Sequence, residues 1–420
     1  MSNAFIRNIK LLVNVRPKTA LLRGAEMALL PCIENAWLQI EDGRIASYGS
    51  MDSIGERGNH SGSGHMINAK DTMVLPSWCD SHTHLVFAGS REAEFVDKIR
   101  GKTYAEMNAS GGGILNSARR LNASTEDELF ASAWKRLEEV SKLGTGAVEI
   151  KSGYGLTVDG ELKMLRVIKK LKERSRLTIK SSFLGAHTYP EAFRDNHQGY
   201  IDLIIGEMLP VIAREKLADF IDVFCEKGFF SPGEMETICK AGMSYGLKPK
   251  LHVNQLNSIG GIAAGIQLKA VSLDHLEVMT DEDIELISHT GENGPVATLL
   301  PTAAFFLREP LQPARKLIDA GCGIALASDY NPGSSPSGNM NFVLSLACIQ
   351  MHMLPEEALN AATINGAHAM ECGNELGSIT VGKKANLIFT KPIPSLAYLP
   401  YAFGSNLIDK VMIGGEMISK

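Results

Sequence analysis

The strongest constraint on the fold of this chain is an alternation of short β-prone runs with stretches of helical periodicity. One such stretch, Gly160–Arg174, places Leu162, Leu165 and Ile168 on one face of a helix. Eight such units favour a closed (β/α)8 barrel of the TIM type, and we predict this α/β fold for residues 73–376. The eight runs are Met73–Asp80, Thr145–Ile150, Thr178–Leu184, Phe220–Cys225, Pro249–Val253, Ala270–Leu273, Pro295–Leu300 and Cys322–Ala327.

Local signals place some of the connecting segments. Ser231-Pro232 predicts a helix over Gly233–Gly246, because serine is a good N-cap and proline is tolerated in the first turn. Thr280, followed by acidic residues, predicts another helix start. The first two runs are too far apart for a single helix, so we expect an inserted segment at Phe87–Arg120.

The two ends of the chain resemble each other and differ from the middle. Ala36–Ser50 contains two apolar runs around Asp42–Gly43, which predicts a hairpin. Residues 377–420 return to the same pattern of strands and turns. We therefore expect a small β-sandwich domain assembled from residues 1–72 and 377–420.

Composition excludes several classes of protein. Lys and Arg number 42 against 47 Asp and Glu, so no basic excess is present to bind nucleic acid. No apolar run reaches the ~20 residues that a membrane helix needs, so we expect no membrane helix, and the N-terminal pattern leads us to expect no signal peptide. The seven cysteines contain no C-x-x-C pair, which is typical of reduced thiols, and we expect a cytoplasmic protein.

Five of the eleven histidines lie at predicted strand ends, where barrels carry their catalytic groups. His82 and His84 are two residues apart on a strand, so both rings point to the same side. By itself this pair has an alternative interpretation as two unrelated surface histidines. The other residues at strand ends are His187, His252, His275 and Asp329. Three imidazoles and one carboxylate suit Zn²⁺ or Fe²⁺.

Such an ion would lower the pKa of bound water from ~16 to ~7 and make hydroxide available at neutral pH. Asp329 could bind the ion and accept the water proton, and His275 could hydrogen-bond the water or an oxyanion. The alternative for Asp329 is a helix N-cap.

Further polar residues lie at the same predicted rim. Arg91 could clamp a substrate carboxylate through two parallel hydrogen bonds, or it could be a solvated surface residue. Tyr154, in the segment Lys151–Gly155, offers a hydroxyl between glycines, although a simple turn would explain this segment equally well. Asn331, Gly333 and Ser334 supply amide, backbone and hydroxyl groups, and turn chemistry is again the alternative.

Several sequence blocks together carry a resemblance to a known family. The blocks are DSHTHLVFAGSR (Asp80–Arg91), EIKSGYGL (Glu149–Leu156), FLGAHT (Phe183–Thr188), SLDHLE (Ser272–Glu277), ASDYNPGSSPSGNM (Ala327–Met340) and GSITVGKKANLIF near the C-terminus. The chain resembles the imidazolonepropionase family of the amidohydrolase superfamily from the first hairpin to the C-terminal strands. Asn386 departs from the aspartate that is more usual in the last block.

The resemblance implies hydrolysis of the cyclic amide of 4-imidazolone-5-propanoate to N-formimidoyl-L-glutamate, a step of histidine degradation to glutamate. It implies a homodimer with one Zn²⁺ or Fe ion per subunit. By the motif matches, the ligands are His82, His84, His252 and Asp329. Asp329, His275 and His187 take the catalytic roles. The substrate or product contacts are Arg91, Tyr154, His187, Gln255, Asn331, Gly333 and Ser334.

Two positions qualify this assignment. Gln255 stands where some family members carry glutamate, and because an amide is no general base, that role would pass to Asp329 or His275. Some relatives bridge two metals with a modified lysine of the fourth strand. Lys151 follows the second run instead, so we predict one metal.

Two other functions are kept as alternatives. An aminohydrolase of the same superfamily could act on a purine or pyrimidine base, and Arg91 is the discriminating residue because only the propanoate needs a cationic clamp. A barrel that only binds or scaffolds would hold no metal and leave the imidazolone unchanged.

Overall fold

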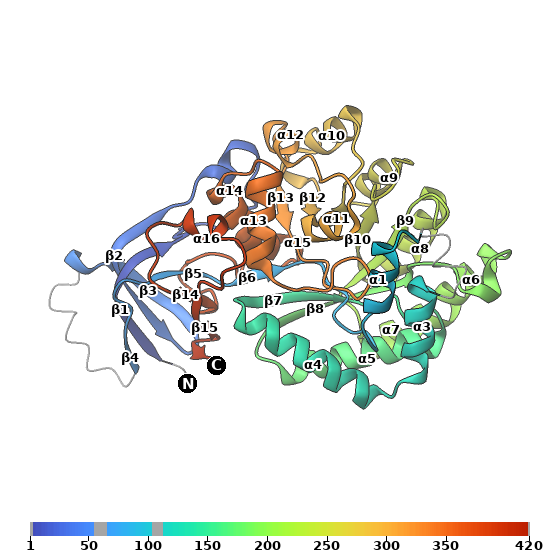
Figure 1. The fold of residues 1–420 in the computed structure, drawn as a ribbon, viewed down its shortest axis with the longest axis horizontal. Coiled ribbons are helices and arrows are strands. Elements are labelled where there is room, and N and C mark those ends of the chain that lie inside the picture. Colours follow the sequence, from blue (N-terminus) through green and yellow to red (C-terminus); the bar gives the residue numbers. More distant parts are fainter. Residues whose placement is uncertain (1–2, 54–64, 103–111, 419–420) are drawn as a thin grey trace.

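The computed structural model of the protein describes residues 3–53, 65–102 and 112–418. It contains a sheet of parallel strands that forms a barrel and a mixed sheet that is built from both ends of the chain. In Figure 1 the mixed sheet lies to the left of the barrel, and both chain termini lie beside it. No helix within the described ranges is long and apolar enough to cross a membrane.

Eight parallel strands follow one another around the barrel in chain order, which confirms the predicted (β/α)8 fold. Most of their residues are buried, because helices cover the outer face and side chains fill the interior. Each predicted run overlaps one of these strands. They are β6 (Trp78–Asp80), β7 (Thr145–Lys151), β8 (Thr178–Ala186), β9 (Phe220–Cys225), β10 (Lys248–Val253), β11 (Ser272–His275), β12 (Val296–Leu299) and β13 (Ile324–Leu326).

The barrel closes through the residues that follow its first and last strands. The backbone N–H of Asp329 donates to the carbonyl of His82 at 3.0 Å, and that of His84 donates to the carbonyl of Tyr330 at 2.9 Å. The residues after β6 therefore lie directly against the residues after β13, at the carboxyl end of the barrel.

The outer helices begin where the capping residues predict. Ser231 caps α8 (Pro232–Ser244), and Thr280 caps α10 (Asp281–Ser288). The predicted apolar face of α5 (Val158–Arg174) is buried. The remaining helices after the insertion are α4 (Glu126–Lys142), α6 (His197–Leu203), α7 (Leu209–Glu215), α9 (Gly261–Gln267), α11 (Pro301–Leu307), α12 (Ala314–Asp319), α13 (Met340–Gln350), α14 (Pro355–Asn360), α15 (Gly366–Ala369) and α16 (Tyr398–Tyr401).

The expected insertion between the first two barrel strands is present. It contributes α1 (Glu92–Ile99) and α3 (Gly113–Ala123) on the same side of the barrel as the strand ends (Figure 1). Residues 103–111 of the predicted insertion lie outside the described residues.

The mixed sheet joins the two ends of the chain through hydrogen bonds. Its order is β16-β15-β14-β5-β1-β2-β3, with β4 paired to β1. The predicted hairpin forms between β2 and β3, and Asp42 and Gly43 both have positive φ in its turn. The strands are β1 (Ala4–Val13), β2 (Cys32–Glu41), β3 (Arg44–Ser50), β4 (His65–Asn68), β5 (Met73–Pro76), β14 (Leu387–Thr390), β15 (Ile408–Ile413) and β16 (Glu416–Met417).

This sheet differs from the expectation in two respects. The strands form one continuous hydrogen-bonded sheet in place of the two sheets of a β-sandwich, because β5 pairs with β1 on one side and β14 on the other. The run Met73–Asp80, expected as one barrel strand, is split, so that residues 73–76 belong to the mixed sheet. The domain boundaries between residues 72 and 73 and between residues 376 and 377 stay a prediction.

Candidate metal centre and catalytic cavity

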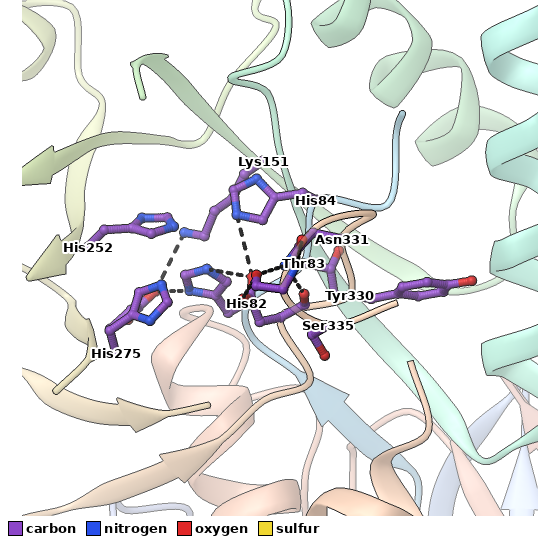
Figure 2. A network of polar contacts seen from close by, with 12 residues as sticks. His82, Thr83, His84, Lys151, His252, His275, Tyr330, Asn331 and Ser335 are labelled. Atoms are coloured by element: carbon purple, nitrogen blue, oxygen red, sulfur yellow. Dashed lines mark hydrogen bonds and ion pairs between the residues drawn. The ribbon is translucent and has the colours of Figure 1, made fainter. Parts of the chain in front are cut away.

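Three histidines predicted as metal ligands come together at the carboxyl end of the barrel. His82 and His84 follow β6, and His252 is the fifth residue of β10. All three are buried, and one potential ligand atom of each lies within 4.8 Å of those of the other two. Figure 2 shows their rings gathered together, with Lys151 extending in among them from β7.

The carboxylate predicted as the fourth ligand, Asp329, lies beside this group. Its Oδ1 is 3.5 Å from Nε2 of His82 and 3.6 Å from Nε2 of His84. Burial raises the pKa of Asp329 to about 6. The next helix, α13, has Asn339 as its N-cap, so the alternative that Asp329 caps a helix is wrong.

The polar atoms of this group fit a bound cation. Nε2 of His82, Nε2 of His252 and Oδ1 of Asp329 are buried and have no hydrogen-bond partner among the described residues. Leaving such atoms unsatisfied costs about 1–3 kcal/mol each, and a shared ion would remove that cost. Burial is the main cause that keeps the pKa of each of the three histidines well below its usual value, so their nitrogens are available as neutral ligands.

Two carboxylates that the sequence analysis did not identify hold the other ring nitrogens. Nδ1 of His82 lies 2.7 Å from Oδ2 of Asp274, and Nδ1 of His252 lies 2.8 Å from Oδ2 of Asp222. Carboxylates in this position fix the tautomer and the orientation of ligand rings. A signal was present in the sequence, because Asp222 interrupts the apolar run Phe220–Cys225 and Asp274 directly follows the predicted run Ala270–Leu273.

His275 is held at the same end of the barrel by an acidic partner. Its Nδ1 lies 3.2 Å from Oε1 of Glu277, which also accepts a hydrogen bond from Gln312 at 2.8 Å. Burial opposes charge on this ring, but the nearby carboxylates of Glu277, Asp329 and Asp274 together outweigh burial and raise the pKa of His275 to about 9. The raised pKa favours the protonated form of this ring, in which both ring nitrogens are hydrogen-bond donors.

A cavity of about 570 Å³ opens over the histidine group. It brings together all the residues that were predicted to contact substrate, from four parts of the barrel rim and the insertion. His84, His252, His275 and Asp329 line its inner part, together with Arg91, Tyr154, His187, Gln255, Asn331, Gly333 and Ser334. The individual roles of these residues stay predictions.

Arg91 reaches this cavity, but its guanidinium is already engaged. Its Nε and Nη2 donate to Oε2 of Glu94 at 2.9 and 2.6 Å. Glu94 in turn accepts hydrogen bonds from Gly113 and Asn116 of α3, so the pair joins α1 to α3. The Nε–Nη2 edge of the guanidinium is thus occupied by Glu94, and among the described residues no hydrogen bond is made by Nη1. A side chain at Gly333 would put its Cβ 2.2 Å from this Nη1.

Tyr154 and His187 form one wall of the cavity. His187 stacks on His84, with ring centroids 5.3 Å apart, and its Nδ1 lies 3.0 Å from the carbonyl of Gly153. Burial lowers the pKa of His187 to about 4, so this ring is neutral. Buried Glu161, which the sequence analysis also missed, anchors the Tyr154 loop by accepting three backbone hydrogen bonds.

The residues after β13 are ordered by their own side chains. Asn331 accepts hydrogen bonds from the backbone of Gly333 and Ser334, both at 2.8 Å. The Ser334 hydroxyl donates to Oδ2 of Asp329 at 3.2 Å. This tight turn explains the turn-like composition of the segment and also directs its polar groups into the cavity.

Comparison with known proteins agrees with this arrangement. Residues 73–418 match the amidohydrolase family. An imidazolonepropionase of Flavobacterium johnsoniae is 59% identical over 98% of this chain and 99% of its own length. One from a Geobacillus species is 40% identical over 100% and 99%. The chain belongs to the imidazolonepropionase family.

Solved structures of other amidohydrolases share the fold of this imidazolonepropionase-family chain. Guanine deaminase of E. coli superposes with a TM-score of 0.73 at 14% identity, covering 100% of this chain and 99% of that one. A zinc-bound adenosine deaminase of Xanthomonas campestris gives 0.68 at 16% identity, covering 99% and 92%. At these identities the likeness concerns the fold alone.

Removal of one histidine tests the ligand assignment. We expect His252→Ala to lose tight metal binding, because only two histidines of the group would remain. Elemental analysis of the purified variant measures this directly. His289→Ala, at an exposed position on the same barrel, is the control and should keep its metal. Wild-type metal content in His252→Ala would show that His252 is no ligand.

Proposed function

We propose that this chain hydrolyses 4-imidazolone-5-propanoate to N-formimidoyl-L-glutamate. The observation that carries the proposal is the juxtaposition, in one cavity, of a histidine group with unsatisfied nitrogens and the guanidinium of Arg91. The first can hold a hydrolytic metal, and the second can pair with the propanoate. The relatives that carry the imidazolonepropionase name over nearly their full length support this substrate.

One Zn²⁺ or Fe ion per subunit is proposed as the cofactor, with His82, His84, His252 and Asp329 as ligands. Such an ion, when bound, supplies a Lewis acid that activates water and polarises a carbonyl. The proposed count of one agrees with the place of Lys151, whose ammonium is engaged by Glu149 and Asp222.

The side chains divide the proton transfers between them. Water adds to the ring carbonyl carbon, the ring C–N bond breaks, and the nitrogen leaves with a proton. Asp329, with its pKa raised toward neutrality by burial, accepts a proton of the attacking water and returns it to the leaving ring nitrogen. The charged ring of His275 donates a hydrogen bond to the oxygen of the ring carbonyl as negative charge develops there.

The remaining cavity residues position the substrate. Neutral His187 and the amide of Gln255 hydrogen-bond the imidazolone ring, and Gln255 takes no proton. Nη1 of Arg91 binds the propanoate, and Tyr154 contacts substrate and product with its hydroxyl. Asn331 and Gly333 contact the product, and Ser334 contacts the substrate. An aminohydrolase that acts on a nucleobase would need no cation at the position of Arg91.

We also propose a cytoplasmic homodimer with no nucleic-acid or membrane partner. The resemblance to the family supports the dimer. The compartment is supported by the seven cysteines, which are all free thiols.

Asp329→Asn tests the proposed base. The amide keeps the size of the side chain but removes the charge and the proton acceptor. We expect kcat to fall by ~100-fold or more, which is the scale of losing a general base. The rate is measured as loss of imidazolone absorbance with freshly prepared substrate. Turnover at the wild-type rate would contradict this mechanism.

Substitution of Arg91 tests the identity of the substrate. A lysine keeps the charge but cannot serve Glu94 and the propanoate together, so we expect kcat/KM to fall by ~10-fold or more, as charged hydrogen bonds contribute ~1.5–3 kcal/mol. Arg91→Met should cost more. An imidazolone without the carboxylate should be hydrolysed almost equally by both variants and the wild type.

The control for this series is Arg100→Met, an exposed arginine of the same insertion, which should leave both substrates unaffected. Equal losses on the two substrates in the Arg91 variants would mean that Arg91 supports the fold or the metal site. The aminohydrolase alternative would then be favoured.

A further inference from the structure

A layer of charged side chains lies inside the barrel next to the ligand histidines. It contains Lys151 and Glu149 of β7, Asp222 of β9, Lys250 of β10 and Asp274 of β11, and all five side chains have 0% exposure. Glu149 and Lys151 are two residues apart on one strand, so both point into the barrel. Buried charges of this kind are stable only when they are paired with each other.

Lys151 contacts the same carboxylate oxygens that hold the ligand histidines. Its Nζ lies 2.8 Å from Oδ2 of Asp222, and this oxygen is 2.8 Å from Nδ1 of His252. Nζ also lies 3.5 Å from Oδ2 of Asp274, and that oxygen is 2.7 Å from Nδ1 of His82. A single ammonium thus connects the carboxylate partners of two histidines that come from different strands.

We propose that Lys151 is a positioning residue for the metal centre. Its ammonium holds the Asp222 and Asp274 carboxylates at fixed places, and these carboxylates hold the rings of His252 and His82. Without the Lys151 ammonium, Lys250 would remain beside Asp274, but the Asp222 and Asp274 carboxylates would no longer share a cation and would move apart. The rings of His82 and His252 would then turn away from the proposed metal position. This inference rests on the proposed metal site.

Lys250 provides a matched control in the same layer. It has the same burial, but its Nζ donates to the Ser272 hydroxyl at 2.6 Å and to the carbonyl of Ala369 at 3.0 Å. Its distance to Oδ2 of Asp274 is 3.8 Å, and its closer carboxylate is Glu149 at 3.1 Å. Lys250 also stabilises Asp274, both directly and through the Ser272 hydroxyl, which donates to Oδ1 of Asp274. Its loss leaves the contacts of Lys151 with Asp222 and of Asp222 with His252 in place.

The test compares Lys151→Met with Lys250→Met in the full chain. Zn²⁺ affinity is measured on metal-stripped protein by competition with a chromophoric chelator, and the thermal midpoint is measured without metal. We expect Lys151→Met to bind Zn²⁺ ~10–100-fold more weakly, which is the range for outer-sphere partners of metal ligands. Lys250→Met should lower the thermal midpoint comparably and change the Zn²⁺ affinity much less. The absorption spectrum of bound Co²⁺ should change only in Lys151→Met.

Each other outcome overturns the inference. Unchanged Zn²⁺ affinity in Lys151→Met, or equal losses of Zn²⁺ affinity in the two variants, would mean that Lys151 stabilises the core without positioning the metal ligands. If Lys151→Met fails to fold, Lys151→Gln, which keeps one donor group, is measured in the same way. Failure of both variants to fold would mean that the lysine is needed for the barrel itself. If the wild-type protein bound neither Zn²⁺ nor Co²⁺, the proposed metal site itself would be wrong. This outcome is distinct from a failure of the Lys151 inference, because it is seen without any substitution.

Discussion

The candidate site depends on how the barrel closes. Residues 82–84 and 329–330 lie far apart in the chain, and two backbone hydrogen bonds hold them side by side at the carboxyl end of the barrel. The carboxylate of Asp80 reinforces this closure by accepting hydrogen bonds from both the backbone and the hydroxyl of Ser328. Because of this closure, two histidines from the first barrel unit and the aspartate from the last face the same space.

The charges beneath the site explain why such a polar centre is tolerated inside a protein. Removing one member of a buried ion pair typically costs about 3–5 kcal/mol, so a layer like that around Lys151 persists only if all its members are present. Backbone strain at Asp329 and His275 likewise persists only because the surrounding structure supports it. Asp329 and His275 both adopt positive φ, 51° and 87°, and non-glycine residues do so at a cost that the surrounding structure must offset. These features orient groups toward one point before any substrate arrives.

Much of this arrangement follows from local patterns in the sequence. The strand and helix periods predicted the barrel, and the rule that barrel strands carry function at their carboxyl ends brought His82, His252, His275 and Asp329 together. The same rule placed Tyr154 and His187 at the rim, and the motif matches added Gln255. Periodicity did not separate Met73–Pro76 from Trp78–Asp80, because the two strands are adjacent and similarly apolar.

The partners of the site residues were harder to predict. Glu94 lies three residues after Arg91, a spacing at which side chains at a helix start can meet, but its further contacts with Gly113 and Asn116 depend on how the two helices of the insertion pack together. Asp222, Asp274 and Lys151 come from three strands whose relative heights in the barrel are set by closure. The available signal was a charged residue inside a strand. Such a residue indicates that an oppositely charged or hydrogen-bonding partner exists, but it does not identify that partner.

The most direct test of the central claim is a single turnover measurement in ¹⁸O-labelled water with the wild-type protein before and after metal removal. We expect the metal-stripped protein to be inactive on fresh 4-imidazolone-5-propanoate and to recover when Zn²⁺ or Fe²⁺ is restored. Mass spectrometry should then identify N-formimidoyl-L-glutamate with one labelled oxygen in its new carboxylate. Undiminished hydrolysis by fully stripped protein, or no ring opening after metal is restored, would contradict the account.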